Sequence, residues 1–184
     1  VIIRPRGGDF LYNELECEVM MRDIEMARRI GVDGVVLGCL TAEGNVDVKM
    51  MRELMDVAGQ MSVTFHRAFD MCCDPFAALQ DIEELGCHRI LTSGQQPSAE
   101  AGIPLLKELV EKANNVIIMP GCGINAGNIA KIAKETGAHE FHLSARMSVE
   151  GGMLYRNPRV SMGGTVQVAE YGRDVTSVEK ASAA

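Results

Sequence analysis

Short apolar runs alternate along the chain with longer stretches in which apolar residues recur every three or four positions. The short runs are rich in β-branched residues and predict strands at 1–4, 34–37, 62–66, 89–91, 116–119 and 140–143. The longer stretches predict amphipathic helices at 14–30, 46–58, 75–85, 104–113 and 125–136. In the second of these, Val46, Met50, Leu54 and Val57 share one helical face.

Strands that alternate with helices indicate a parallel sheet covered by helices. An open doubly wound sheet and a closed (β/α)₈ barrel of the TIM type both fit this α/β pattern. Six strands are two fewer than a barrel needs, and the first begins at residue 1. We therefore expect an incomplete TIM-type barrel of about six strands, with its first two βα units missing upstream. The chain is expected to be one domain over 1–184, with barrel units in 1–146 and an irregular C-terminal segment in 147–184.

The charge and composition of the chain exclude some classes of binding partner. With 18 basic and 25 acidic side chains the net charge is −7, which argues against nucleic acid or an anionic membrane as the main partner. No apolar run approaches the roughly 18–20 residues of a transmembrane helix, and no signal peptide is visible. The six cysteines form no C-x-x-C pair. A cytoplasmic protein with free thiols is therefore expected.

Small or polar residues follow every predicted strand, at the edge where α/β proteins place their ligands. In the last strand Glu140, His142 and Ser144 share a face, which we expect to point into the barrel. A buried ion-pair network is the structural alternative for these three. If the protein is an enzyme, the predicted acid–base and charged groups are His66, Arg67, Asp70, Glu140 and His142.

Two glycine-containing loops suggest an anion site. The loops at 92–94 and 121–123 follow the fourth and fifth strands, where barrels often hold phosphate on backbone N–H groups. Asn125 could cap the next helix. Such glycines also serve purely steric needs, so this interpretation stays open. The predicted anion-binding or ligand-binding residues are Arg4, Arg6, Asp9, Thr92, Ser93, Gly94, Gly121, Gly123 and Ser144.

Thiols offer a third kind of chemistry. Cys39, Cys72, Cys73 and Cys122 all come just after strands, near the expected mouth of the barrel. Converging thiolates would suit a soft ion such as Cu(I). Cys72 and Cys73 are adjacent, so their side chains cannot easily point the same way, and the spacing is not that of a known metal motif.

Five stretches together resemble the CutC copper homeostasis family: IRPRGGDFLY (3–12), VTFHRAFD (63–70), RILTSG (89–94), IIMPGCGI (117–124) and EFHLSAR (140–146). The resemblance implies a TIM-type barrel in a cytoplasmic, oligomeric protein that binds Cu(I), with nuclear presence left open. Its signature residues would be Arg4, Arg6, Asp9, His66, Arg67, Asp70, Thr92, Ser93, Gly94, Glu140, His142 and Ser144. This chain departs from the family at Gly121-Cys122-Gly123, where three glycines are usual.

These patterns support three hypotheses. The first is a cytosolic protein of copper homeostasis that binds Cu(I), with the copper ion as its partner. The second is a TIM-barrel enzyme that acts on a small anionic or phosphorylated metabolite, because most of the motif residues are Arg, Asp, His, Thr and Ser rather than sulfur ligands. The third is a fragment that is inactive and poorly soluble alone, because a barrel without two units leaves strand edges unpaired.

Overall fold

The computed structural model describes residues 1–163, 166 and 169–184. The helices are α1 (Glu14–Arg29), α2 (Val48–Ala58), the 3₁₀ helix η1 (Arg67–Met71), α3 (Pro75–Glu84), α4 (Ile103–Lys112), α5 (Ile129–Thr136) and α6 (Val178–Ser182). The strands are β1 (Gly34–Leu37), β2 (Ser62–Phe65), β3 (Arg89–Thr92), β4 (Ile117–Pro120), β5 (Arg146–Glu150) and β6 (Gly172–Thr176).

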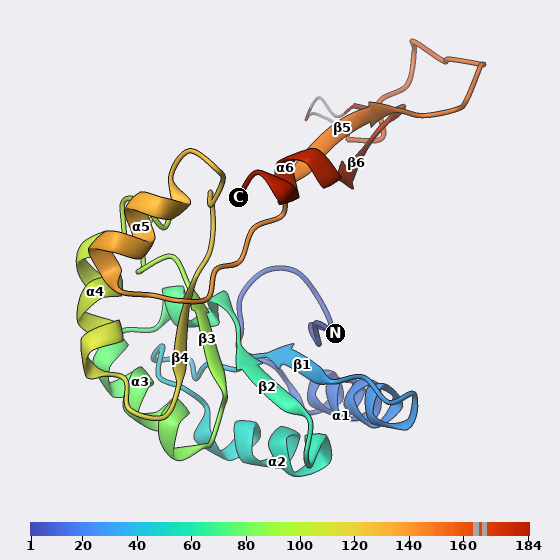
Figure 1. Ribbon diagram of the computed structural model, residues 1–184. Helices are drawn as coiled ribbons and strands as arrows, with labels where there is room; N and C mark the ends of the chain where they lie inside the picture. Colours follow the sequence, from blue (N-terminus) through green and yellow to red (C-terminus); the bar gives the residue numbers. More distant parts are fainter. Residues whose placement is uncertain (164–165, 167–168) are drawn as a thin grey trace.

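β1 to β4 form a parallel sheet in the order β1-β2-β3-β4. Across it Val36 lies opposite Thr64, and Ile90 lies opposite both Phe65 and Ile118. Figure 1 shows a curved sheet with α1 to α5 arranged around its outer side. The predicted α/β fold with a parallel sheet is therefore confirmed.

The two outermost predicted strands are reduced to single bridges, which corrects the expected six. Residues 1–4 contribute the Ile2–Val36 bridge, and residues 140–143 contribute the His142–Gly121 bridge. Each segment has a neighbour on one side only, so few hydrogen bonds hold it, such as His142 N–H to Pro120 O at 2.9 Å. The sheet among the described residues accordingly has four strands.

Local sequence explains where several helices begin. At α1 the Asn13 side chain accepts from the N–H of Glu16, whose carboxylate accepts from the N–H of Asn13, which makes a capping box. At α3 the Asp74 side chain accepts from backbone N–H groups of the first turn, and Pro75 supplies a preset φ. Asn125 does not cap α5, contrary to expectation, because the helix starts later, at Ile129.

The hydrophobic core lies between the sheet and its helices. Strand residues at alternate positions pack outward against apolar helix faces, as the pleat of a strand requires. Fully buried members include Met20, Ile24, Leu37, Leu54, Phe65, Phe69, Ile82, Ile90 and Leu106. The other face of the sheet is more open: Ile2 is 62% exposed and Ile117 is 40% exposed.

The C-terminal segment is more regular than predicted. β5 and β6 pair as an antiparallel sheet, with Met147 opposite Val175, and α6 follows. Figure 1 shows this hairpin projecting from the rest of the molecule. The expected irregularity of this segment rested on Gly151-Gly152, Asn157-Pro158 and Gly163-Gly164. These pairs fall in the connection between the two strands, and Gly164 lies outside the described residues. Within the described part of the chain, we find no helix long and apolar enough to cross a membrane.

Candidate functional site

The predicted site residues come mainly from the carboxyl ends of β2, β3 and β4. Because the strands are parallel, the segments after them meet at one edge of the sheet. His66 and η1 follow β2, Ser93 follows β3 and Gly121 follows β4. We call this edge the mouth.

Asp70 is the organising residue of the mouth. Its side chain is only 6% exposed. The carboxylate accepts hydrogen bonds from the Thr92 hydroxyl (2.5 Å), the Ser93 N–H (3.0 Å) and the Gln95 N–H (3.2 Å). These bonds tie η1 to the loop after β3 and satisfy a buried charge.

Arg67 is fixed by the same carboxylate. Its Nε donates to Asp70 Oδ2 at 2.6 Å, and a terminal nitrogen donates to Ser93 Oγ at 3.0 Å. Burial lowers the pKa of Arg67, but the hydrogen bond and charge of Asp70 outweigh it and raise the pKa overall. The Arg67 side chain is 43% exposed, so its positive charge is fixed in position and accessible at the mouth.

A hollow of about 220 Å³ adjoins this guanidinium. Arg67, Cys122, Gly123, His142 and Ser144 lie on its wall. The structure thus brings together predicted catalytic, anion-binding and thiol residues that are far apart in the sequence. No acidic residue lines the hollow among the residues that the structure describes, so it favours an anion over a cation.

The loop after β3 binds an internal carboxylate. The N–H groups of Ser93 and Gln95 point at Asp70, and the Thr92 hydroxyl accepts from the Gly94 N–H at 2.9 Å. We expected this loop to bind an external anion. Asp70 takes that place in the structure.

The glycine loop after β4 is shaped by packing. The Gly121 N–H donates to Thr92 O, and a Cβ at Gly121 would lie 2.4 Å from Leu91 Cδ1. Cys122 has a φ of 79°, a left-handed conformation that strains an L residue. The Cys122 thiol donates to Pro97 O at 3.2 Å.

Glu140 lies away from the mouth. It pairs with Arg89 through two contacts of 2.5 and 3.1 Å, and Arg89 also reaches Ser62 Oγ at 3.3 Å. Since Arg89 and Ser62 are the first residues of β3 and β2, this network sits at the amino ends of these strands. The hydrogen bond from Arg89 lowers the pKa of Glu140. Glu140 therefore takes part in an ion pair, but the partner is Arg89 and the pair is about one third exposed rather than buried; it lies at the opposite end of the strands from His66.

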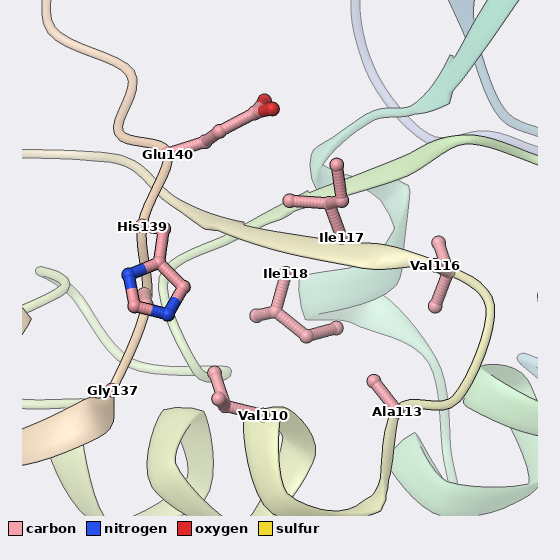
Figure 2. A pocket seen from close by; sticks show the side chains of 9 residues that line it. Val110, Ala113, Val116, Ile117, Ile118, Gly137, His139 and Glu140 are labelled. Carbon is pink, nitrogen blue, oxygen red and sulfur yellow. The ribbon is translucent and has the colours of Figure 1, made fainter.

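A second hollow, of about 270 Å³, lies at this same end and is shown in Figure 2. Ile118 and Val110 lie on its apolar side, and the Glu140 side chain points to the side of β4 that faces away from α4. Its lining is largely apolar, so it offers little for recognising a charged ligand.

His66 is buried, with 4% exposure. Its Nδ1 accepts from the Ala68 N–H at 3.2 Å and caps η1. Burial, with a smaller effect from the Arg4 charge, lowers the pKa of His66 to about 4. The imidazole is therefore neutral at neutral pH.

Arg6 and Asp9 hold their own loop. Arg6 donates to Glu16 Oε1 at 2.6 Å and to Leu11 O at 2.7 Å, and pairs with Asp9 at 2.9 Å. The hydrogen bond to Glu16 raises the pKa of Arg6. Arg4 is freer: it donates to Gly8 O at 2.8 Å.

The candidate thiols do not converge. Cys39 is in the core, where burial raises its pKa far above the usual range. Burial raises the pKa of Cys72 to about 12, and its sulfur receives a hydrogen bond from Gln95. The exposed Cys73 thiol donates to Asn45 Oδ1. Among the described residues, no three or more His, Cys, Asp or Glu side chains form a group that could hold a metal ion.

Sequence reasoning missed two contributors, Gln95 and Phe10. Gln95 connects to Asp70 through its N–H and to Cys72 O through its side chain at 2.8 Å. Phe10 packs on His66 with ring centroids 5.0 Å apart. Phe10 lies within the first motif, so its place in the same motif as Arg4 and Arg6 was the available signal.

A parallel sheet with helices on its outer side and polar residues at the carboxyl ends of its strands defines a protein of the TIM-barrel type. A solved structure described as a copper homeostasis protein CutC from Streptococcus agalactiae superimposes with a TM-score of 0.74 and 36% identity, over 77% of this chain and 70% of that one. One described as a deoxyribose-phosphate aldolase from Coccidioides immitis has a TM-score of 0.57 at 11% identity and supports the fold alone.

The family model described as "CutC family" matches residues 1–147, and the chain belongs to this family. A CutC family protein of Bacteroides fragilis is 60% identical over 98% of this chain and 72% of its own length. The human relative named "Copper homeostasis protein cutC homolog" is 48% identical over 98% of this chain and 66% of its own length. The predicted family is therefore confirmed.

Proposed function

We propose that this chain acts in copper homeostasis as a Cu(I)-binding protein. The main support is its family, in which a relative 48% identical over nearly the whole chain is named for copper homeostasis. Copper is here the cargo of the protein. Thiol and thioether sulfur are the ligands that suit Cu(I).

The sulfur segment Met71-Cys72-Cys73 is the best candidate for the copper ligands. Met71 is 68% exposed, and the Cys73 thiol is exposed as well. Cys72 is buried beside them at the end of η1. Because a thiol must lose its proton to bind a metal, the raised pKa of Cys72 makes Cys73 the expected first ligand.

A competition titration tests this role. The chain is titrated with Cu(I) against a chelator of known affinity, as the unmodified protein and as C73S, M71L and C122S variants. Cys122 is the matched control because it is a partly accessible thiol on another loop. We expect C73S to weaken binding at least tenfold and C122S to leave it unchanged. Equal affinities for all four proteins would refute the proposal.

The hollow beside Arg67 supports a second candidate function, an enzyme or binding protein for a small anionic metabolite. A guanidinium held by Asp70, the His142 imidazole and the Ser144 hydroxyl line one concave space. Arginine suits carboxylates and phosphates because its fork of donors matches their oxygens. In this account Arg67 binds the anion, and His142 exchanges protons with the substrate.

A thermal-shift screen against inorganic phosphate and a set of carboxylates and phosphorylated metabolites tests this function. The R67Q variant is compared with R52Q, which removes the same charge from an exposed position of α2. Stabilisation that R67Q loses and R52Q retains supports the candidate. Stabilisation in neither protein, or equally in both, rejects it.

We also infer a cytoplasmic location.

We further infer that the protein associates with itself. The connection between β5 and β6 exposes Leu154 (98%), Met162 (83%) and Tyr155 (73%), and such side chains on a projecting hairpin favour contact with another protein surface. Light scattering of the L154S/M162S double variant tests this. A smaller particle than the unmodified protein is expected, and an unchanged mass would count against this contact.

A further inference from the structure

The register of the sheet brings Arg4, Gly38 and His66 to one level at the mouth. Ile2 bridges Val36, and Val36 pairs with Thr64. Side chains two positions further along each segment point to the same face, which places Arg4, Gly38 and His66 side by side there.

Gly38 makes room for the imidazole. A Cβ at this position would lie 2.7 Å from His66 Nδ1 and 2.9 Å from Cε1. The imidazole ring therefore lies over the backbone of Gly38. Gly38 directly follows β1, the strand between β2 and the N-terminal segment that carries Arg4.

The hydrogen bonds of His66 fix its tautomer. Nδ1 accepts from the Ala68 N–H, so in the neutral ring the proton is on Nε2. Among the described residues, His66 Nε2 and the Tyr12 hydroxyl are the only buried side-chain nitrogen or oxygen atoms without a hydrogen-bond partner. Nε2–H is thus a buried donor without an acceptor, and it cannot ligate a metal ion in this tautomer.

Phe10 packs against the imidazole that carries this donor. Its ring centroid is 5.0 Å from the imidazole, and the Arg4 guanidinium carbon lies 4.7 Å from the same ring. Phe10 also borders a cavity of about 470 Å³ that Leu40 and Met71 line, and His66 is not part of its wall. The ring therefore has space to move away from His66, and the preceding Gly7-Gly8 gives its loop freedom.

We propose that His66 Nε2–H and Arg4 form a binding site for an anionic oxygen group, a carboxylate or a phosphate, and that Phe10 moves into the adjacent cavity when the ligand enters. Arg4 supplies charge, and His66 supplies a neutral donor in a water-poor position. None of the thiols takes part, and the site is separate from the hollow beside Arg67. It goes beyond the copper proposal and stands independently of it.

Imidazole nitrogen NMR of the metal-free chain tests the site. Inorganic phosphate and acetate serve as separate probes, and the His66 signal is the one that H66N lacks. Asn at this position retains an oxygen that can accept from the Ala68 N–H, which helps the variant to fold. R4Q is compared with R52Q, and both residues are exposed.

We expect a saturable shift of the His66 Nε2 signal with at least one probe, and we expect R4Q to weaken it at least fivefold while R52Q leaves it unchanged. Binding of acetate would identify the ligand group as a carboxylate, and binding of inorganic phosphate would identify it as a phosphate. No saturable shift with either probe, or a shift of equal strength in R4Q and R52Q, would overturn the proposal. The R67Q variant is measured in the same way to separate this site from the hollow beside Arg67. If the two sites are distinct, R67Q loses phosphate binding at the hollow but keeps the shift of the His66 signal.

Discussion

The Asp70 carboxylate and the Ser93 backbone N–H lie 3.0 Å apart, although 23 residues separate them in the chain. This contact joins η1 to the loop after β3. It holds Arg67 in place because the same carboxylate accepts from Arg67 Nε. The buried Asp70 carboxylate thus organises the mouth, because it is the anion that the N–H groups of the loop after β3 bind.

Removing this charge should destabilise the fold. D70N keeps the shape of the side chain but directs an NH₂ group toward N–H donors and leaves Arg67 unpaired. We expect a loss of about 1–3 kcal/mol in the free energy of unfolding, because Asp70 is buried and the N–H groups that it satisfies lose their acceptor. Urea denaturation measures it. D23N, at an exposed position of α1, should change stability by less than about 0.5 kcal/mol. A D70N loss no larger than that of D23N would contradict this role.

Acid should weaken the protein through His66. Its pKa is about 4 when folded, against an ordinary value of 6.5. The unfolded chain therefore takes up a proton between pH 6.5 and 4 while the folded one does not, so stability falls as the pH drops through this window and levels off below it. The total is about 3 kcal/mol at 1.36 kcal/mol per pH unit. Urea denaturation at several pH values should show a flatter profile for H66N. Parallel profiles would exclude His66 as the cause.

The Arg89–Glu140 pair should matter little for stability. Both side chains are about one third exposed. Solvent screening then limits a single ion pair to about 1 kcal/mol or less. We expect E140Q to lower the free energy of unfolding within this range and to leave ligand binding at the mouth unchanged, because the pair lies at the opposite end of the strands. Loss of binding in E140Q would show that Glu140 acts in the site after all.

Gly38 should tolerate no side chain. The added methyl of G38A would press on the buried His66 ring from 2.7 Å. We expect a cost of about 1–3 kcal/mol, the usual range for overpacking. G7A is the matched control because nothing lies within 4 Å of a Cβ there. Thermal melts of both variants compare the two sites, and equal melting temperatures would disprove the close packing.

The sequence predicted the core of the sheet well because buried strands carry a strong apolar signal. β1 matches its prediction at Gly34–Leu37, β2 and β3 differ by one residue at one end, and β4 is shifted by one residue. The apolar pattern could not show that the segments at 1–4 and 140–143 form only single bridges. Whether such a segment becomes a strand depends on hydrogen bonds to its neighbours and not on its side-chain pattern. The strands β5 and β6 are largely exposed and therefore lack the alternation that marks a half-buried strand.

The sequence predicted which residues gather at the mouth better than it predicted the contacts that they make there. The motifs located His66, Arg67, Asp70 and Ser144 at the mouth, because the loops after parallel strands all lie at one edge of the sheet. They did not reveal that the N–H groups after β3 bind Asp70, since an internal carboxylate and an external anion require the same loop. The place of Glu140 depends on its pairing with Arg89, which lies 51 residues away in the chain.

Copper K-edge X-ray absorption of the Cu(I)-loaded chain tests the central claim, that sulfur at residues 71–73 binds copper. We predict a first shell of sulfur scatterers alone, with at least one sulfur lost in C73S and none lost in C122S. A shell of nitrogen and oxygen, or one that C73S leaves unchanged, would contradict the claim.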